Sequence, residues 1–263
     1  MNKVVVLGNA WHDENGKATG GKPGDQLQTV SPDYKGEVRF TQFYKSPKGW
    51  IVLRPLKPKH AKKLVKIMTQ ACNNPHIGYS QGDRYGIISA GTKTRKDCNC
   101  DCSSLVRQCI KEATGTDPGD FYTATEVDAL RATGLFYNPM EYDDKMTLYA
   151  GDVLVTKIKG HTAIVVEGES RTNPYTVPNM PVTSRANAEK YNLKEYSWLG
   201  DYVRWVQWEL CRVGYQQQVD ACGGIDGQCG EGTVRCIAKF QAVVGLPERG
   251  ICGKQTRKAL KKA

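Results

Sequence analysis

The chain has 263 residues, of which 40% are hydrophobic and 24% are charged. This composition is typical of a globular protein, and no stretch approaches the ~18 apolar residues of a membrane-spanning helix. The formal net charge of +10 favours anionic partners such as nucleic acid, a membrane surface or an acidic polymer. Because the basic residues form no long run, we expect no nucleic-acid binding, and because no long apolar stretch is present, we expect no membrane insertion.

The elements expected from hydrophobic periodicity mix strands and helices over the first two hundred residues. In chain order they are strands at 36–45 and 49–56, a helix at 58–72, a loop at 73–101, helices at 103–113 and 123–133, and two strands within 151–168. This order predicts an α+β fold for residues 1–197.

The pattern changes near residue 198 to apolar stripes of helical spacing with glycine punctuation. An internal echo, G-x-C-G-x-x-T, occurs at 227–233 and again at 250–256. We interpret each copy as a tight glycine turn in which the threonine caps the following helix. Residues 198–263 are therefore predicted to form a small three-helix domain.

This C-terminal segment resembles the peptidoglycan-binding domain of bacterial and phage wall hydrolases. The matching positions are Val206-Gln207, Gly214-Tyr215, Asp226-Gly227, Gly230, Thr233, Phe240-Gln241, Gly245-Leu246, Gly250, Gly253 and Thr256. Cys229 and Cys252 replace the bulkier apolar residues that are usual there, which suggests a thiol pair or a disulfide between the two corners. The resemblance implies that bacterial cell-wall peptidoglycan is a partner.

The N-terminus has only a short apolar run, whereas a signal peptide needs about 7–15 apolar residues and a cleavage site. We therefore expect the protein to be made and folded in a cytoplasm. In that compartment the ten cysteines are expected to be free thiols, metal ligands or a nucleophile rather than a disulfide framework.

The strongest candidate for chemistry is Cys102, which lies where a polar loop meets an amphipathic helix. A helix N-terminus stabilises a thiolate, so we expect the pKa of this thiol to be depressed. A zinc site that includes Cys98, Cys100, Cys102 and Cys109 is the alternative, although structural zinc sites favour C-x2–4-C pairs. The candidate general base is His161, at the start of an apolar strand.

Three segments together resemble the NlpC-type cysteine peptidases and the related CHAP amidases, which have a papain-like fold. They are Asp101-Cys102-Ser103-x-Leu105-Val106, Gly151-Asp-Val-Leu-Val155 and Gly160-His-Thr-Ala-Ile-Val-Val166. The resemblance implies that Cys102 is the nucleophile and His161 the general base. It also implies that Asp101 and Ser103 contact the stem peptide of the substrate.

Two further roles are carried over from the same families. The polar residue that orients the histidine is usually twelve positions after it, which points to Asn173; Glu167 is too far along the strand. The tyrosine upstream of the nucleophile would be Tyr79, near the substrate, although its spacing to Cys102 is longer than usual.

These resemblances together imply a phage-type endolysin that hydrolyses amide bonds of peptidoglycan peptides through a thioacyl enzyme. The alternatives are an N-acetylmuramoyl-L-alanine amidase of the same fold and a non-catalytic wall-binding protein. No metal or other cofactor is expected. The expected location is the cytoplasm of the host bacterium until lysis and then the cell wall, with release that depends on a separate membrane-permeabilising protein.

Overall fold

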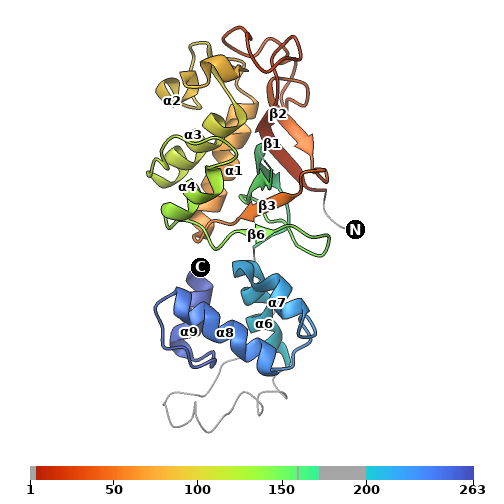
Figure 1. Cartoon of the computed structure of the whole chain (residues 1–263), viewed down its shortest axis with the longest axis vertical. Coiled ribbons are helices and arrows are strands. Elements are labelled where there is room, and N and C mark those ends of the chain that lie inside the picture. The colour runs from red at the N-terminus through yellow and green to blue at the C-terminus, as the bar shows by residue number, and fades with distance from the viewer. Residues whose placement is uncertain (1–3, 159, 172–199) are drawn as a thin grey trace. The chain divides into compact units, whose positions relative to one another are not determined.

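The computed structural model describes residues 4–158, 160–171 and 200–263. Internal contacts divide the chain into a first unit, residues 1–170, and a second unit, residues 171–263 (Figure 1). The expected domain boundary between residues 197 and 198 lies outside the described residues. None of the helices in the described part of the chain is long and apolar enough to cross a membrane.

The first unit is built on a six-stranded sheet with the order β2-β1-β8-β7-β3-β6, in which all neighbours are antiparallel. Its strands are β1 (Val6–Ala10), β2 (Val38–Gln42), β3 (Trp50–Leu53), β6 (Met140–Glu141), β7 (Val153–Thr156) and β8 (Thr162–Glu167). The central strands β1, β7 and β8 are buried along almost their whole length, which places apolar side chains on both faces of the sheet.

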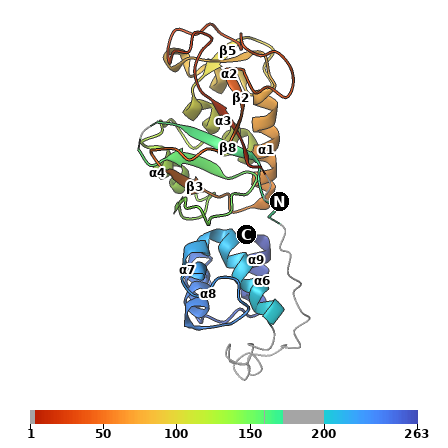
Figure 2. The same ribbon diagram turned by 90° about the vertical axis from the view of Figure 1, so that its right-hand side faces the viewer.

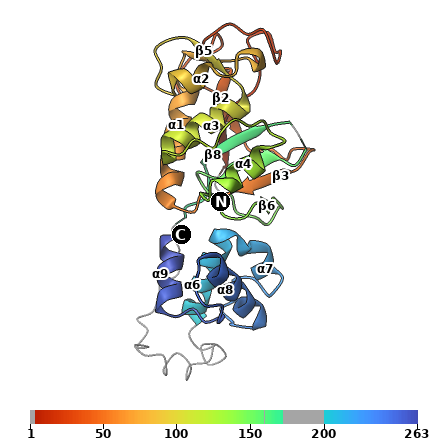
Figure 3. The same ribbon diagram turned by 60° about the vertical axis from the view of Figure 1, so that its left-hand side comes forward.

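Helices cover one face of this sheet, as Figures 1 and 3 show. They are α1 (Pro58–Cys72), α3 (Cys102–Thr114) and α4 (Glu126–Ala132), and α1 and α3 both contact β1 and β8. On this face the core includes Val38 and Phe40, whereas a second core on the opposite face includes Leu7 and Trp50. The sheet therefore separates two apolar layers.

Close packing of α1 on the sheet depends on Gly8 in the middle of β1. A Cβ atom at this position would lie 2.3 Å from Cγ of Met68 and 3.1 Å from Sγ of Cys72, both on α1. A larger residue would push the helix away from the central strand, since packed interiors leave no such space.

The predicted α+β class of the first unit agrees with this mixed architecture, and the helix predicted at 58–72 has the same bounds as α1. The predicted loop at 73–101 is wrong in part. It contains the parallel pair β4 (Ile77–Tyr79) and β5 (Cys98–Cys100), the turn η1 (Gln81–Asp83) and the helix α2 (Gly86–Ala90). Figure 2 shows β5 and α2 together at one end of the first unit. Elements of three to five residues carry too few positions for a periodic pattern.

A buried ion pair joins the end of β3 to the start of β7. Arg54 donates from Nε to Oδ1 of Asp152 (2.9 Å) and from Nη2 to Oδ2 (2.8 Å), with both side chains at most 2% exposed. Asp152 also accepts a hydrogen bond from the backbone N–H of Tyr149, and the guanidinium stacks on the Tyr149 ring. This bidentate contact fixes the end of the sheet at which β7 begins.

The second unit is helical, with α6 (Gly200–Leu210), the π-helical turn η3 (Cys211–Tyr215), α7 (Gln216–Asp220), α8 (Glu231–Val243) and α9 (Lys254–Lys262) (Figure 2). The prediction of three helices missed the short α7. Cys229 and Cys252 are both buried, and all ten cysteines are free thiols. The expected thiol pair is therefore present as two thiols, without a disulfide.

Two glutamines explain the repeated G-x-C-G-x-x-T motif. Gln207 accepts from the backbone N–H of Gly227 and donates to the hydroxyl of Thr233 (2.9 and 3.3 Å). Gln241 repeats the pattern with Gly250 and Thr256, at 2.9 Å for both bonds. The prediction that the threonines cap the helices is wrong, since Gly230 and Gly253 occupy the N-cap positions.

We expect Arg54→Met to lower the free energy of unfolding of the first unit by about 3–5 kcal/mol, because it leaves the buried Asp152 carboxylate unpaired. Lys45→Ala, which removes the exposed pair with Asp144, is the matched control and should cost at most about 1 kcal/mol. Chemical denaturation of the variants measures both values. Equal effects of the two substitutions would contradict this role of the Arg54–Asp152 pair.

Candidate active site

The site is organised around the N-terminus of α3, which Asp101 caps. Its carboxylate accepts a hydrogen bond from the backbone N–H of Ser104 (2.7 Å), and the Ser104 hydroxyl accepts one from the backbone N–H of Asp101 (2.9 Å). This reciprocal pair is a capping box, which satisfies two donors that a helix start otherwise leaves free. Cys102 is consequently held as the first residue of the helix.

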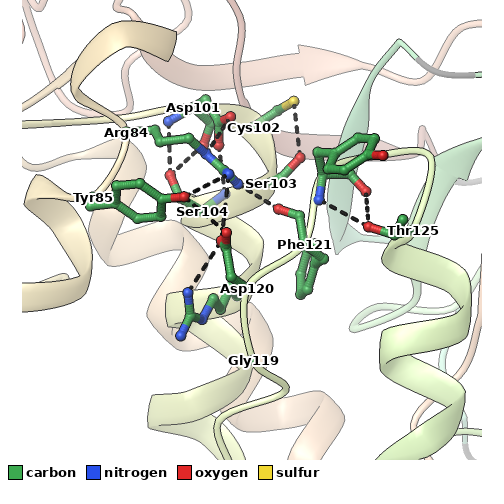
Figure 4. A network of polar contacts seen from close by, with 12 residues as sticks. Arg84, Tyr85, Asp101, Cys102, Ser103, Ser104, Gly119, Asp120, Phe121 and Thr125 are labelled. Carbon is green, nitrogen blue, oxygen red and sulfur yellow. Dashed lines mark hydrogen bonds and ion pairs between the residues drawn. The ribbon is translucent and has the colours of Figure 1, made fainter.

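An ion-pair network holds the cap in place (Figure 4). Nε of Arg84 lies 2.8 Å from Oδ2 of Asp101, and its Nη2 donates to the backbone carbonyl of Phe121. Asp120 accepts a hydrogen bond from the Tyr85 hydroxyl (2.8 Å) and lies 3.4 Å from Arg84. Because Asp101 is engaged by both the helix and Arg84, its contact with a stem peptide stays a prediction.

The Cys102 thiol is 7% exposed and lies against the strand that follows His161. Its sulfur accepts a hydrogen bond from the backbone N–H of Thr162 and lies 3.9 Å from the Ser103 hydroxyl. The Thr162 N–H belongs to the peptide that joins His161 to Thr162. The backbone that follows His161 therefore lies beside the Cys102 thiol, although the two residues are 59 positions apart in the chain.

The expected depression of the Cys102 pKa is wrong. Burial raises this pKa to about 12, and the negative charges of Asp101 and Glu126 add to the shift. The hydrogen bonds from Ser103 and Thr162 act in the opposite direction but are smaller. Desolvation thus outweighs the helix N-terminus, because a charge deep in the protein loses its hydration.

His161 is presented by the turn between β7 and β8. Its backbone N–H donates to the Thr156 hydroxyl (3.0 Å), and its carbonyl accepts from the Thr156 N–H (3.0 Å). The imidazole lies 4.7 Å from the ring of Trp11 and 6.4 Å from that of Trp50, between centroids. Burial, followed by the positive charge of Arg39, lowers the pKa of His161 to about 4, which favours the neutral imidazole.

Nε2 of His161 is buried and has no hydrogen-bond partner among the described residues. A ring nitrogen without a partner is free to exchange a proton, as a general base must. The residue proposed to orient the ring, Asn173, lies outside the described residues.

Glu126, the first residue of α4, is a site residue that the sequence analysis missed. It is fully buried and accepts a hydrogen bond from the Thr162 hydroxyl (2.7 Å), while its Oε2 has no partner in the described part of the chain. Burial raises its pKa to about 8. In the sequence it resembles any acidic residue in the first turn of a helix, so no local signal distinguishes it.

Two tyrosines lie near the thiol. Tyr79 in β4 is 3% exposed, and its hydroxyl accepts a hydrogen bond from Gln81 (3.1 Å). Burial, followed by the charge of Cys102, raises the pKa of Tyr79. The pKa of Tyr44 is also raised, to about 12, mainly by burial and to a smaller extent by the charge of Cys102. Tyr79 thus lies near Cys102, and its contact with substrate stays a prediction.

The alternative of a zinc site finds no support in the geometry. Over residues 4–158, 160–171 and 200–263, no three or more His, Cys, Asp or Glu side chains are grouped so that they could hold a metal ion. Cys100 instead donates to the carbonyl of Gly78, and Cys109 lies within the apolar core.

Comparisons with known proteins identify two segments. Residues 7–172 match the family described as an endolysin-like domain, and residues 200–260 match a family described as a peptidoglycan binding domain. No curated protein and no solved structure shows significant similarity to the chain.

The pKa shifts make Cys102 and His161 a neutral pair in the resting protein. The thiol loses its proton only near pH 12 and the imidazole gains one only near pH 4, so neither is charged between these values. We expect the ultraviolet absorbance of the wild type at pH 7 to lack a thiolate contribution relative to Cys102→Ser. A thiolate difference that appears at pH 7 and disappears in His161→Ala would show an ion pair instead.

Proposed function

Because the chain belongs to the endolysin-like domain family and carries a peptidoglycan-binding domain, we propose that it is a cysteine peptidoglycan hydrolase that cuts amide bonds of wall peptides. The observation that carries the proposal is the capped start of α3, which holds Cys102 against β8, the strand that follows His161. This supports Cys102 as the nucleophile and His161 as the base, the arrangement that the resemblance to NlpC- and CHAP-type thiol hydrolases implies.

The reaction begins with the neutral pair. As the Cys102 sulfur attacks the carbonyl carbon of the amide, His161 accepts the thiol proton, so that no free thiolate has to form in the buried site. The tetrahedral intermediate collapses when His161 gives this proton to the leaving amine, and a thioacyl enzyme remains. His161 then takes a proton from water, the hydroxide attacks the thioester, and the acid product leaves as the thiol is restored.

The start of α3 supplies the groups that stabilise the oxyanion. The first backbone N–H to bond within the helix is that of Leu105, which donates to the carbonyl of Asp101 (3.0 Å), and the Ser104 N–H is bound to the cap. The N–H groups of Cys102 and Ser103 precede these bonds at the positive end of the helix dipole. They are therefore the proposed donors to the developing negative charge.

The second unit keeps the enzyme on its polymeric substrate. Its match to a peptidoglycan-binding family makes the wall a partner, and the net charge of +10 favours an anionic wall. We further propose that the protein resides in the cytoplasm of the host bacterium, and that a separate membrane-permeabilising protein gives it access to the wall.

We expect Cys102→Ala and His161→Ala to reduce wall lysis by at least about 1,000-fold, because each removes one half of the proton-transfer pair. Cys222→Ala is the matched control, since Cys222 is exposed and lies in the second unit, and it should lyse walls like the wild type. Turbidity loss of purified walls measures lysis, and sedimentation shows that each variant still binds them.

Mass spectrometry of the digested wall identifies the bond. New amines on amino acids within the stem or its cross-link indicate an endopeptidase, and new L-alanine amines indicate the amidase alternative. Full lysis by Cys102→Ala would refute the cysteine mechanism, and binding without any release of fragments by the wild type would point to a non-catalytic wall-binding protein.

A further inference from the structure

Arg39 differs from the other arginines that lie partly inside the first unit. Arg54, Arg84 and Arg107 each form an ion pair with an aspartate. Arg39, in β2, is half-buried, and its Nε is buried without a hydrogen-bond partner. Among the described residues no carboxylate pairs with it.

The position of Arg39 links it to the catalytic pair. Its guanidinium carbon lies 6.0 Å from the centroid of the Trp11 ring, and the Trp11 ring lies 4.7 Å from that of His161. Trp11 is 40% exposed, although it is a large apolar side chain. Arg39, Trp11 and His161 therefore follow one another from the sheet to the proposed site of attack.

This arrangement lacks a negative group. A partly desolvated guanidinium without a counter-charge is unfavourable, and its planar fork matches a carboxylate with two parallel hydrogen bonds. An exposed tryptophan beside it offers an apolar surface for the rest of a ligand. Since extended peptide advances about 3.3 Å per residue, the distances above correspond to two or three residues of a substrate.

We propose that Arg39 and Trp11 form a subsite that binds a carboxylate-bearing residue of the peptide substrate near the amide that Cys102 attacks. The proposal rests on the proposed function for the identity of the substrate. It means that the enzyme distinguishes wall peptides whose carboxyl groups are free from peptides in which the same groups are amidated.

The test measures binding in the full chain with Cys102→Ala, which does not depend on turnover. The probes are a synthetic wall stem peptide with free side-chain and α-carboxylates and the same peptide with these groups as carboxamides. Adding Arg39→Ala should weaken binding of the carboxylate peptide about 10- to 100-fold, as expected for loss of a charged hydrogen bond, and change binding of the carboxamide less than about 3-fold.

Matched variants separate the subsite from general effects. Arg95→Ala removes an exposed arginine of the same unit and should leave both affinities unchanged. Arg39→Lys keeps the charge but loses the planar guanidinium, so its loss of affinity for the carboxylate peptide should be smaller than that of Arg39→Ala. This variant also replaces Arg39→Ala in the test if Arg39→Ala does not fold. Trp11→Ala should weaken the binding of both peptides, since in the proposed subsite the Trp11 ring contacts the apolar part of the peptide.

The subsite proposal fails if Arg39→Ala weakens the binding of the two peptides equally. It also fails if the parent Cys102→Ala protein binds the carboxylate and carboxamide peptides with the same affinity. These outcomes are independent of the proposed function, which fails if the wild type releases no fragments from walls. If the wild type hydrolyses walls but both peptides bind equally, the proposed cysteine hydrolase function stands and only the proposed subsite of Arg39 and Trp11 is rejected.

Discussion

The capping box at the start of α3 is the constraint on which the proposed chemistry depends. Asp101 and Ser104 close the helix end, and Arg84 holds the Asp101 carboxylate in place at 2.8 Å. The cap thereby fixes the position of Cys102, next to the peptide group between His161 and Thr162. Without it the first turn would fray, and the sulfur would lose its fixed position relative to β8.

Burial then sets the state of the reacting groups. It raises the pKa of Cys102 to about 12 and lowers that of His161 to about 4, and both shifts favour uncharged side chains. In the proposed mechanism, attack by the Cys102 sulfur must therefore accompany transfer of its proton. The buried Glu126 below Thr162, with its pKa raised to about 8, keeps this region free of a full negative charge near neutral pH.

The candidates Cys102 and His161 could be proposed from the sequence because their signals are local. Cys102 lies where a polar loop meets an amphipathic helix, which the structure confirms as α3, and His161 precedes an apolar strand, which the structure confirms as β8. Glu126 and Arg39 could not be proposed in this way, because Glu126 contacts Thr162, 36 positions along the chain, and Arg39 lies over Trp11, which follows another strand. The strands β4 and β5 were missed for the same reason, since each is stabilised by the other across the predicted loop.

Trapping of the thioacyl enzyme tests the central claim most directly. The full chain would be mixed with a wall stem peptide, quenched with acid during turnover, digested and analysed by mass spectrometry. We expect an acyl group on the peptide that contains Cys102, sensitive to hydroxylamine and absent in Cys102→Ala. Hydrolysis that proceeds with the acyl group on another residue, or with no acyl enzyme even when its breakdown is slowed, would contradict this expectation.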